Sequence, residues 1–154
     1  MEKKGLDLNI TQSGIDLIVK YEGVRLTPYK CPAGLWTCGV GHLIGDGKSL
    51  PDSWNKCFTL AEVYSILAND LIKYENAVNR YIKVALTQNQ FNALVSFTYN
   101  LGIGTLQRST VRQKINRLDF KGAIQSLLRY DKAGSVALKG LTLRRRAEAK
   151  LMTA

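Results

Sequence analysis

The chain has 154 residues, which suits one domain or two small lobes, and 45% of them are hydrophobic, which is enough to form a core. Its formal net charge is +10, from 22 Lys and Arg against 12 Asp and Glu. This excess favours a polyanionic partner, such as nucleic acid, an anionic membrane or an anionic wall polymer, although ordinary solubility charge explains it equally well. No apolar run approaches the roughly 20 residues of a membrane-spanning helix, which argues against an integral membrane protein.

The N-terminal segment and the cysteines indicate where the protein is made. The first 14 residues, MEKKGLDLNITQSG, have no apolar core of a secretion signal, so we expect the product to collect in the cytoplasm. Residues 1 to about 10 are polar and are expected to be loosely ordered. The three cysteines lack metal-ligand spacing and are expected to be free thiols: Cys31, Cys38 and Cys57.

A helix followed by a β-hairpin is predicted near the N-terminus. Thr11 or Ser13 can cap a helix that Gly23 ends, which leaves Glu22 in the last turn. Two strand-like segments then flank a turn at Gly34. In the second segment, alternation predicts that three side chains share one face: Trp36, Cys38 and Val40.

Residues 43–58 read as loops, with Trp54 and Phe58 as anchors to the core. A capping box at Thr59–Glu62 predicts a helix that runs to about Tyr81. A helix of about 20 residues spans about 30 Å, which is enough to connect two lobes.

The C-terminal half is predicted to be helical. A second capping box, from Thr87 to Gln90, begins a helix that Gly102 ends, and apolar residues on several faces predict that this helix is buried. Shorter helices are expected at about 110–116, 120–130 and 143–152. The run Arg144–Arg146 could bind phosphate, but a solvated helix face with one arginine packed inward is the commoner arrangement.

One spacing in the sequence is specific. Glu22 is followed by eight residues, then Cys31, then five residues, then Thr37. This pattern resembles the phage-type lysozymes of glycoside hydrolase family 24, whose frame is E-G-x-R-L-x-x-Y-x-[DC]-x-x-G-x-x-T-x-G-x-G-H. The positions in register are Glu22, Gly23, Arg25, Leu26, Tyr29, Cys31, Gly34, Thr37, Gly39, Gly41 and His42. SFTYNLG at 96–102 and GLTLRRRAE at 140–148 resemble later family segments, so the resemblance covers about residues 12–152.

The resemblance implies a fold and an activity. The fold would be a lysozyme-like α+β fold, mainly helical, with a small catalytic lobe at about 12–58, an inter-lobe helix at about 59–82 and a helical lobe at about 83–154. The activity would be hydrolysis of the β-1,4 bond between N-acetylmuramic acid and N-acetylglucosamine in peptidoglycan, without metal or cofactor. Such an endolysin would be a monomer that degrades the host cell wall and so lyses the host cell. It would reach the wall from the host cytoplasm through a membrane lesion made by a separate holin, without stable membrane insertion of its own.

The same resemblance implies three catalytic residues. Glycoside cleavage needs a proton donor and a second group that handles attack at the sugar carbon. Glu22 would be the donor, and Cys31 stands where most relatives carry Asp. Cys31 and Thr37 could position a water for inversion, or a Cys31 thiolate could attack directly and give retention. The family resemblance favours inversion.

The environment expected for the cysteines bears on this choice. If Glu22 lies close to Cys31, its negative charge should raise the thiol pKa and keep the thiol neutral, which favours handling of water. A test of Cys31 with thiol reagents is selective provided that Cys38 and Cys57 lie unreactive in the core.

Four further residues take roles from the resemblance. His42, the only histidine, is expected to be a structural partner of Asp70, although a catalytic base is the alternative. Leu43 and Tyr99 match positions that contact the glycan, and Thr110, with Ser109 beside it, is a weaker match.

Two other functions compete with hydrolysis. A wall-binding protein could keep the fold and lose turnover through the change to Cys31, but the intact Glu22 and Thr37 argue against it. A nucleic-acid-binding module is suggested by charge alone, without a recognisable binding motif. Clearing of permeabilised cells, set beside a DNA-binding assay, separates the three.

Overall fold

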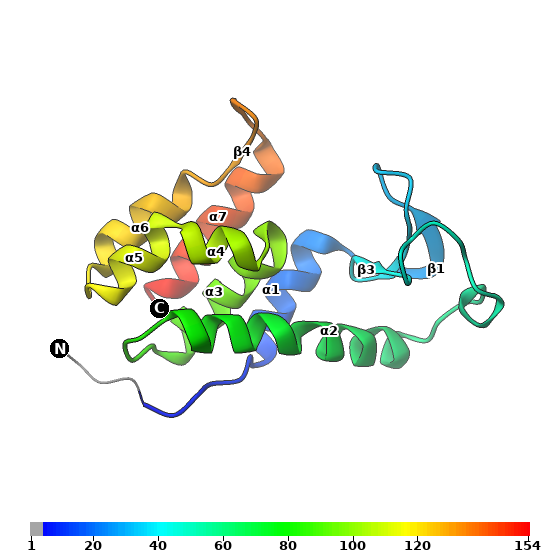
Figure 1. Cartoon of the computed structure of the whole chain (residues 1–154), viewed down its shortest axis with the longest axis horizontal. Coiled ribbons are helices and arrows are strands. Elements are labelled where there is room, and N and C mark those ends of the chain that lie inside the picture. Colours follow the sequence, from blue (N-terminus) through cyan, green and yellow to red (C-terminus); the bar gives the residue numbers. More distant parts are fainter. Residues whose placement is uncertain (1–4) are drawn as a thin grey trace. The chain divides into compact units, whose positions relative to one another are not determined.

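The computed structural model describes residues 5–154, and the chain forms two compact units (Figure 1). One unit is residues 19–72, and the other is residues 73–154 together with the N-terminal residues up to Ile18. The boundaries fall inside helix α1 (Gln12–Glu22) and helix α2 (Leu60–Tyr81). The predicted α+β class, mainly helical, is confirmed. Within residues 5–154, no helix combines the length and the apolarity needed to cross a bilayer.

The unit of residues 19–72 contains a three-stranded antiparallel sheet. Its strands are β1 (Arg25–Lys30), β2 (Trp36–Gly39) and β3 (His42–Leu43), in that order. The predicted hairpin is confirmed, whereas β3 was not predicted because two residues are too few to show an alternation. Cys38 and Val40 are buried.

The sheet packs closely against the first half of α2. Gly39 has a φ of +61°, and a Cβ atom there would lie 3.3 Å from Val63 Cγ1 on that helix. Glycine therefore meets both the backbone requirement and the close approach. The loop between β3 and α2 includes a short 3-10 helix, η1 (Asp52–Trp54), and Phe58 is buried while Trp54 stacks on His42 at 5.3 Å, so the predicted aromatic anchors are confirmed.

Both predicted capping boxes are present. The Glu62 amide donates to Thr59 Oγ1 and the Thr59 amide donates to Glu62 Oε1, at the start of α2. The second box, at Thr87 and Gln90, begins α3 (Gln88–Leu101), which Gly102 ends as expected. Eight consecutive residues of α3, Phe91–Thr98, are buried, so this helix is the predicted core of its unit.

Four more helices and a hairpin complete that unit. The helices are α4 (Ile103–Arg108), α5 (Thr110–Asn116), α6 (Phe120–Leu128) and α7 (Lys139–Met152). The hairpin consists of β4 (Lys132–Ala133) and β5 (Val136–Ala137). Helix α4 and this hairpin were not predicted, and α7 begins four residues earlier than expected, because Gly140 does not prevent a helical start.

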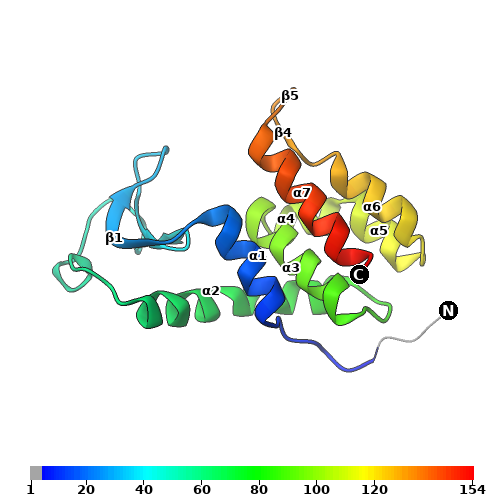
Figure 2. The ribbon, with the colours of Figure 1, turned by 180° about the vertical axis from the view of Figure 1, so that it is seen from behind.

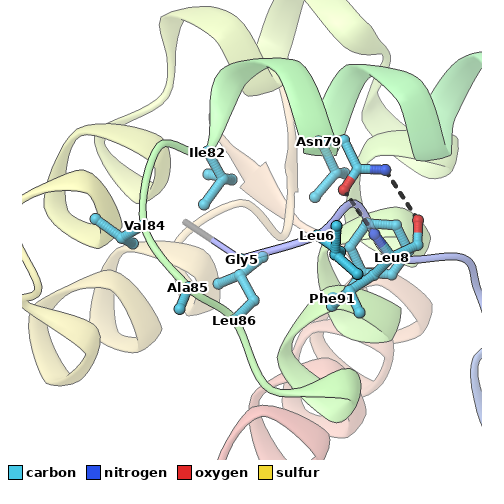
Figure 3. Close-up of a pocket in the computed structure, with 10 residues that line it drawn as sticks. Gly5, Leu6, Leu8, Asn79, Ile82, Val84, Ala85, Leu86 and Phe91 are labelled. Atoms are coloured by element: carbon cyan, nitrogen blue, oxygen red, sulfur yellow. Dashed lines mark hydrogen bonds between the residues drawn. The ribbon is translucent and has the colours of Figure 1, made fainter. Parts of the chain in front are cut away.

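Hydrogen bonds to side chains of α2 fix the backbone of the segment before α1, contrary to the expectation of loose ordering. Asn79 accepts a hydrogen bond from the Leu8 amide and donates one to the Leu8 carbonyl (Figure 3), and Glu75 accepts from the Ile10 amide. Beside this segment lies an apolar pocket of about 280 Å³ that Phe91 helps to line. Residues 1–4 lie outside the described part of the chain, so the expectation is not addressed there.

A buried charge cluster joins α7 to α3. Arg145 Nε lies 2.8 Å from Glu148 Oε1, Arg144 Nε lies 3.4 Å from Glu148 Oε2, and the Ser96 hydroxyl donates to Glu148 Oε2. Arg145 and Glu148 are fully buried, and Arg144 is nearly so. The expectation of one inward arginine was therefore wrong: two pack inward, because Glu148, three and four residues further along α7, reaches both of them.

The charge cluster predicts a large loss of stability when its acid is removed. Glu148→Ala leaves two buried guanidinium groups without their counter-charge, and we expect the free energy of unfolding to fall by about 3–5 kcal/mol. Arg146→Ala, on the exposed side of the same helix, should change it by less than about 0.5 kcal/mol. Urea unfolding followed by circular dichroism measures both, and similar midpoints for the two variants would contradict the importance of the cluster.

Candidate active site

The candidate residues are divided between the two compact units. The unit of residues 19–72 holds Glu22, Cys31, Thr37, His42, Leu43 and Asp70. Tyr99 and Thr110 belong to the other unit. All three candidate catalytic residues therefore lie in one unit: Glu22 at the end of α1, Cys31 in the turn between β1 and β2, and Thr37 on β2.

Glu22 is the last residue of α1 and is half-buried. The Gly23 amide donates to the Val19 carbonyl at 2.9 Å, and Gly23 then adopts a φ of +77°, which ends the helix. This turn carries the chain from the carboxylate directly into β1. The position of Glu22 is thus fixed by a helix end and not by a flexible loop.

The strand register places one row of side chains across the sheet. Tyr29 on β1 pairs with Thr37 on β2, and Thr37 pairs with Leu43 on β3. Directly opposed residues present their side chains on the same face, so these three lie side by side. Thr37 is buried between an exposed Leu43 and a half-buried Tyr29. Tyr29 was not singled out as a site residue, although its place in the family frame was the available signal.

A tight turn holds the candidate sulfur. The Cys31 amide donates to the Leu35 carbonyl at 2.9 Å, and the Gly34 amide donates to the Cys31 carbonyl at 2.7 Å. A hydrogen bond from the Leu35 amide lowers the pKa of the Cys31 thiol below its ordinary value, and the Ala33 amide and the Thr37 hydroxyl act in the same direction. Partial burial opposes them.

This finding corrects the expected direction of the pKa shift at Cys31. We expected the Glu22 charge to dominate and to raise the pKa of Cys31, but the amides of the turn dominate and lower it. Hydrogen bonds to an ionised group favour its charged form, so the turn stabilises a Cys31 thiolate.

The Thr37 hydroxyl has two acceptors within reach. It donates to the Leu35 carbonyl at 3.0 Å, and it also acts on the pKa of Cys31 as a hydrogen-bond donor. Because a hydroxyl has one proton, the two acceptors compete for it. Ionisation of Cys31 strengthens the second acceptor, so the Thr37 hydroxyl is linked to the protonation state of the sulfur.

The pKa of the Tyr29 phenol reflects the charges around the candidate site. Burial raises the pKa of the Tyr29 phenol, and the charges of Cys31 and Glu22 raise it further, while Arg25 lowers it. The Arg25 guanidinium lies over the Tyr29 ring, 4.3 Å from its centroid. Glu22 and Cys31 therefore both lie within electrostatic range of one phenol group.

The predicted pair of His42 and Asp70 is in contact on the other face of the sheet. His42 pairs with Cys38, one residue out of step with the row of Thr37, so its side chain points to the opposite face. There His42 Nδ1 donates to Asp70 Oδ2 on α2 at 2.7 Å. The two side chains are 22% and 21% exposed. This geometry joins the sheet to α2 and separates His42 from Cys31 and Thr37.

The two remaining cysteines differ in their exposure to solvent. Cys38 is fully buried, and burial raises the pKa of its thiol, with a smaller contribution from the Asp70 charge. Cys57, however, is exposed, so the condition for a selective thiol-reagent test is not met there. It sits in the loop before α2, where Phe58 is the residue that packs inward.

The predicted glycan-contacting residues of the helical unit occupy different settings. Tyr99 on α3 is half-buried and packs edge-on against Tyr74 at 5.1 Å. Thr110 is exposed at the first position of α5. Ser109 beside it is buried and caps α5 by accepting from the Arg112 amide, so its hydroxyl is engaged in the fold.

Comparison with known proteins identifies similar chains. The phage lysozyme family profile matches residues 19–148. An endolysin of Acyrthosiphon pisum secondary endosymbiont phage 1 is 36% identical, with 94% of this chain and 97% of that protein covered. The endolysin of Bacillus phage B103 is also 36% identical over 94% of this chain, but the chain spans only 54% of its length. Among solved structures, the muramidase domain of SpmX from Asticaccaulis excentricus is 31% identical with a TM-score of 0.85, over 95% of this chain and 98% of that one.

The contact between His42 and Asp70 predicts a structural penalty when it is broken. Asp70→Asn removes the charged acceptor, and we expect a loss of about 1–3 kcal/mol in unfolding free energy. Asp16→Asn, at an exposed position of α1, is the matched control and should be nearly neutral. Unfolding curves that overlay for the parent and Asp70→Asn would show that the contact contributes nothing to stability.

The lowered thiol pKa predicts early alkylation of Cys31. A lowered pKa means that the thiolate fraction rises at lower pH than in an ordinary thiol, whose pKa is about 8.5. In a Cys57→Ser background, which removes the other accessible thiol, the rate of reaction with iodoacetamide should reach half its maximum below that of N-acetylcysteine. Mass spectrometry locates the adduct. A midpoint at or above that of N-acetylcysteine would contradict the stabilised thiolate.

Proposed function

Because the chain belongs to the phage lysozyme family, we propose that it cleaves the β-1,4 bond between N-acetylmuramic acid and N-acetylglucosamine, with Glu22, Cys31 and Thr37 as its catalytic residues. The chain is a lysozyme-type hydrolase of bacterial peptidoglycan. Glu22 donates a proton to the leaving oxygen. Cys31 and Thr37 assist the attack at the sugar carbon from the opposite side of the ring.

The observation that carries this proposal is the turn at Cys31. Its amides favour a sulfur anion next to the Thr37 hydroxyl, and the charges of that sulfur and of Glu22 both act on Tyr29. A carboxyl group and a stabilised anion near one another are the two components that glycoside hydrolysis requires. This arrangement favours turnover over the rival of a wall-binding protein without activity.

Two routes remain for the step after proton donation. A Cys31 thiolate can accept a proton from a water that attacks the sugar, which inverts the anomeric centre. Alternatively the sulfur attacks the sugar itself and forms a covalent intermediate, and water then displaces the sulfur, so that the two steps together retain the configuration. The lowered pKa serves both routes, so the earlier argument for water based on a neutral thiol no longer applies.

The substrate contacts are assigned on weaker grounds. We propose that Leu43, Tyr99 and Thr110 bind the glycan, and the exposure of Leu43 and Thr110 is compatible with this. Access to the wall through a lesion made by a separate holin, action in the periplasm and a monomeric state stay predictions of the sequence.

Loss of the proton donor is the first test. Glu22→Gln keeps the shape of the side chain and removes its proton, so clearing of permeabilised Gram-negative cells should fall about 10²–10⁴-fold. The melting temperature should change little. Asp16→Asn on the same helix is the control and should clear cells at the parental rate. Parental clearing by a folded Glu22→Gln protein would eliminate this assignment.

Substitution of Cys31 tests the second group. Cys31→Asp supplies the residue that the family pattern most often carries at this position, and it should keep activity, whereas Cys31→Ala should lose at least about 10²-fold. NMR of the first reducing end formed by the parent distinguishes the routes: the α anomer indicates inversion with water, and the β anomer indicates a covalent Cys31 intermediate. Parental activity of Cys31→Ala would exclude both.

A further inference from the structure

The positive charge of the chain is concentrated in its last third. Residues 103–154 contain 12 Lys and Arg side chains but 3 Asp and Glu side chains, so they carry +9 of the net charge of +10. Arg144, Arg145 and Glu148 are buried together, and the other cationic side chains of this segment are exposed or half-buried. A strong positive field therefore belongs to the surface of this part of the helical unit.

Three of these cationic side chains and one leucine form a stripe along the outer face of α7. Lys139, Leu143, Arg146 and Lys150 follow one another at intervals of four, three and four residues, and all four are exposed. This spacing places them along a single helix face. The opposite face of α7 carries Arg144, Arg145 and Glu148 into the core.

The β4–β5 hairpin projects at the N-terminal end of α7 (Figures 1 and 2). Lys132 pairs with Ala137 and Ala133 pairs with Val136, which leaves a two-residue turn that begins at Gly134 with a φ of +63°. Glycine at this position permits a turn that matches the strand twist. Asp131 stabilises the base of the hairpin with two hydrogen bonds. Its carbonyl accepts one from the Leu138 amide, and its carboxylate accepts one from the Thr142 hydroxyl.

The hairpin exposes large apolar side chains. Val136 is 62% exposed and Leu138 is 45% exposed. Both have extended backbone, and alternation places them on the same face of the hairpin as Ala133. Apolar side chains at a projecting tip, next to a cationic stripe, are the combination found in segments that lie at a membrane interface.

We propose that the β4–β5 hairpin and the outer face of α7 form a docking surface for an anionic phospholipid bilayer. Val136 and Leu138 enter the boundary between headgroups and acyl chains, and Lys139, Arg146 and Lys150 contact lipid phosphates. A soluble polyanion, such as nucleic acid or a wall polymer, would match the charge but would leave the two apolar side chains in water. The acid of the hairpin, Asp131, is paired with Lys132 at 3.2 Å and does not cancel the stripe.

Vesicle binding tests the apolar part of this proposal. We expect the full chain to sediment with vesicles of phosphatidylglycerol and phosphatidylethanolamine, and not with phosphatidylcholine vesicles, at physiological ionic strength. Val136→Ser combined with Leu138→Ser should weaken this binding at least about tenfold, because less apolar surface enters the interface. The matched control is Leu60→Ser combined with Ile72→Ser, which removes two comparably exposed apolar side chains elsewhere and should bind as the parent does.

A second pair of variants tests the charged part without altering the hairpin. Each basic side chain near an anionic surface contributes about fivefold to partitioning, so Lys139→Gln with Arg146→Gln should weaken binding by tenfold or more. Lys48→Gln with Lys83→Gln, at exposed positions outside the stripe, should have a smaller effect. Circular dichroism confirms that each variant is folded.

Several results of the vesicle assay would contradict membrane docking. Equal binding to neutral and anionic vesicles, no binding to either, or equal losses in the test and control pairs would overturn the proposal. A loss with the charge variants alone would also overturn it, because Val136 and Leu138 would then not enter the bilayer. Hydrolysis of soluble fragments does not enter these readouts, so the proposal and the proposed catalysis succeed or fail independently.

Discussion

The register of the three-stranded sheet is the constraint on which the candidate site depends. Because side chains alternate between faces, the pairing of Tyr29, Thr37 and Leu43 fixes one face, and the pairing of Cys38 and His42 fixes the other. A slip of one residue would exchange the two faces. The contact between His42 and Asp70 joins the second face to α2, and the backbone of Gly39 approaches Val63 of the same helix closely, so both resist such a slip.

The turn between β1 and β2 shows how backbone can replace a side-chain charge. Where an aspartate ionises readily by itself, a thiol needs help to become an anion, since its ordinary pKa lies above neutrality. The amides of Leu35 and Ala33 supply this help at Cys31. The turn thus shifts the cysteine of this family pattern toward the ionised form that aspartate has in the common form.

Much of the fold could be predicted because its signals are local. Capping boxes at Thr59 and Thr87 and the stop at Gly102 depend on residues within one helical turn, and the structure reproduces them. The β4–β5 hairpin and α4 escaped prediction because their segments are too short to show a period. The thiol pKa of Cys31 was predicted in the wrong direction, since sequence shows the nearby carboxylate but not the orientation of backbone amides. Likewise, only the fold reveals that Glu148 reaches two arginines.

The pinning of the N-terminal segment has a consequence for the order in which the chain folds during synthesis. The Leu8, Ile10 and Thr11 amides find their acceptors on Asn79, Glu75 and Asn92, which are 65 to 81 residues further along. The ribosome therefore releases the first segment long before its partners exist, while the intervening residues 19–72 can already close on themselves. The unit made of both ends of the chain must form last, and its N-terminal part remains hydrated until α3 has emerged from the exit tunnel.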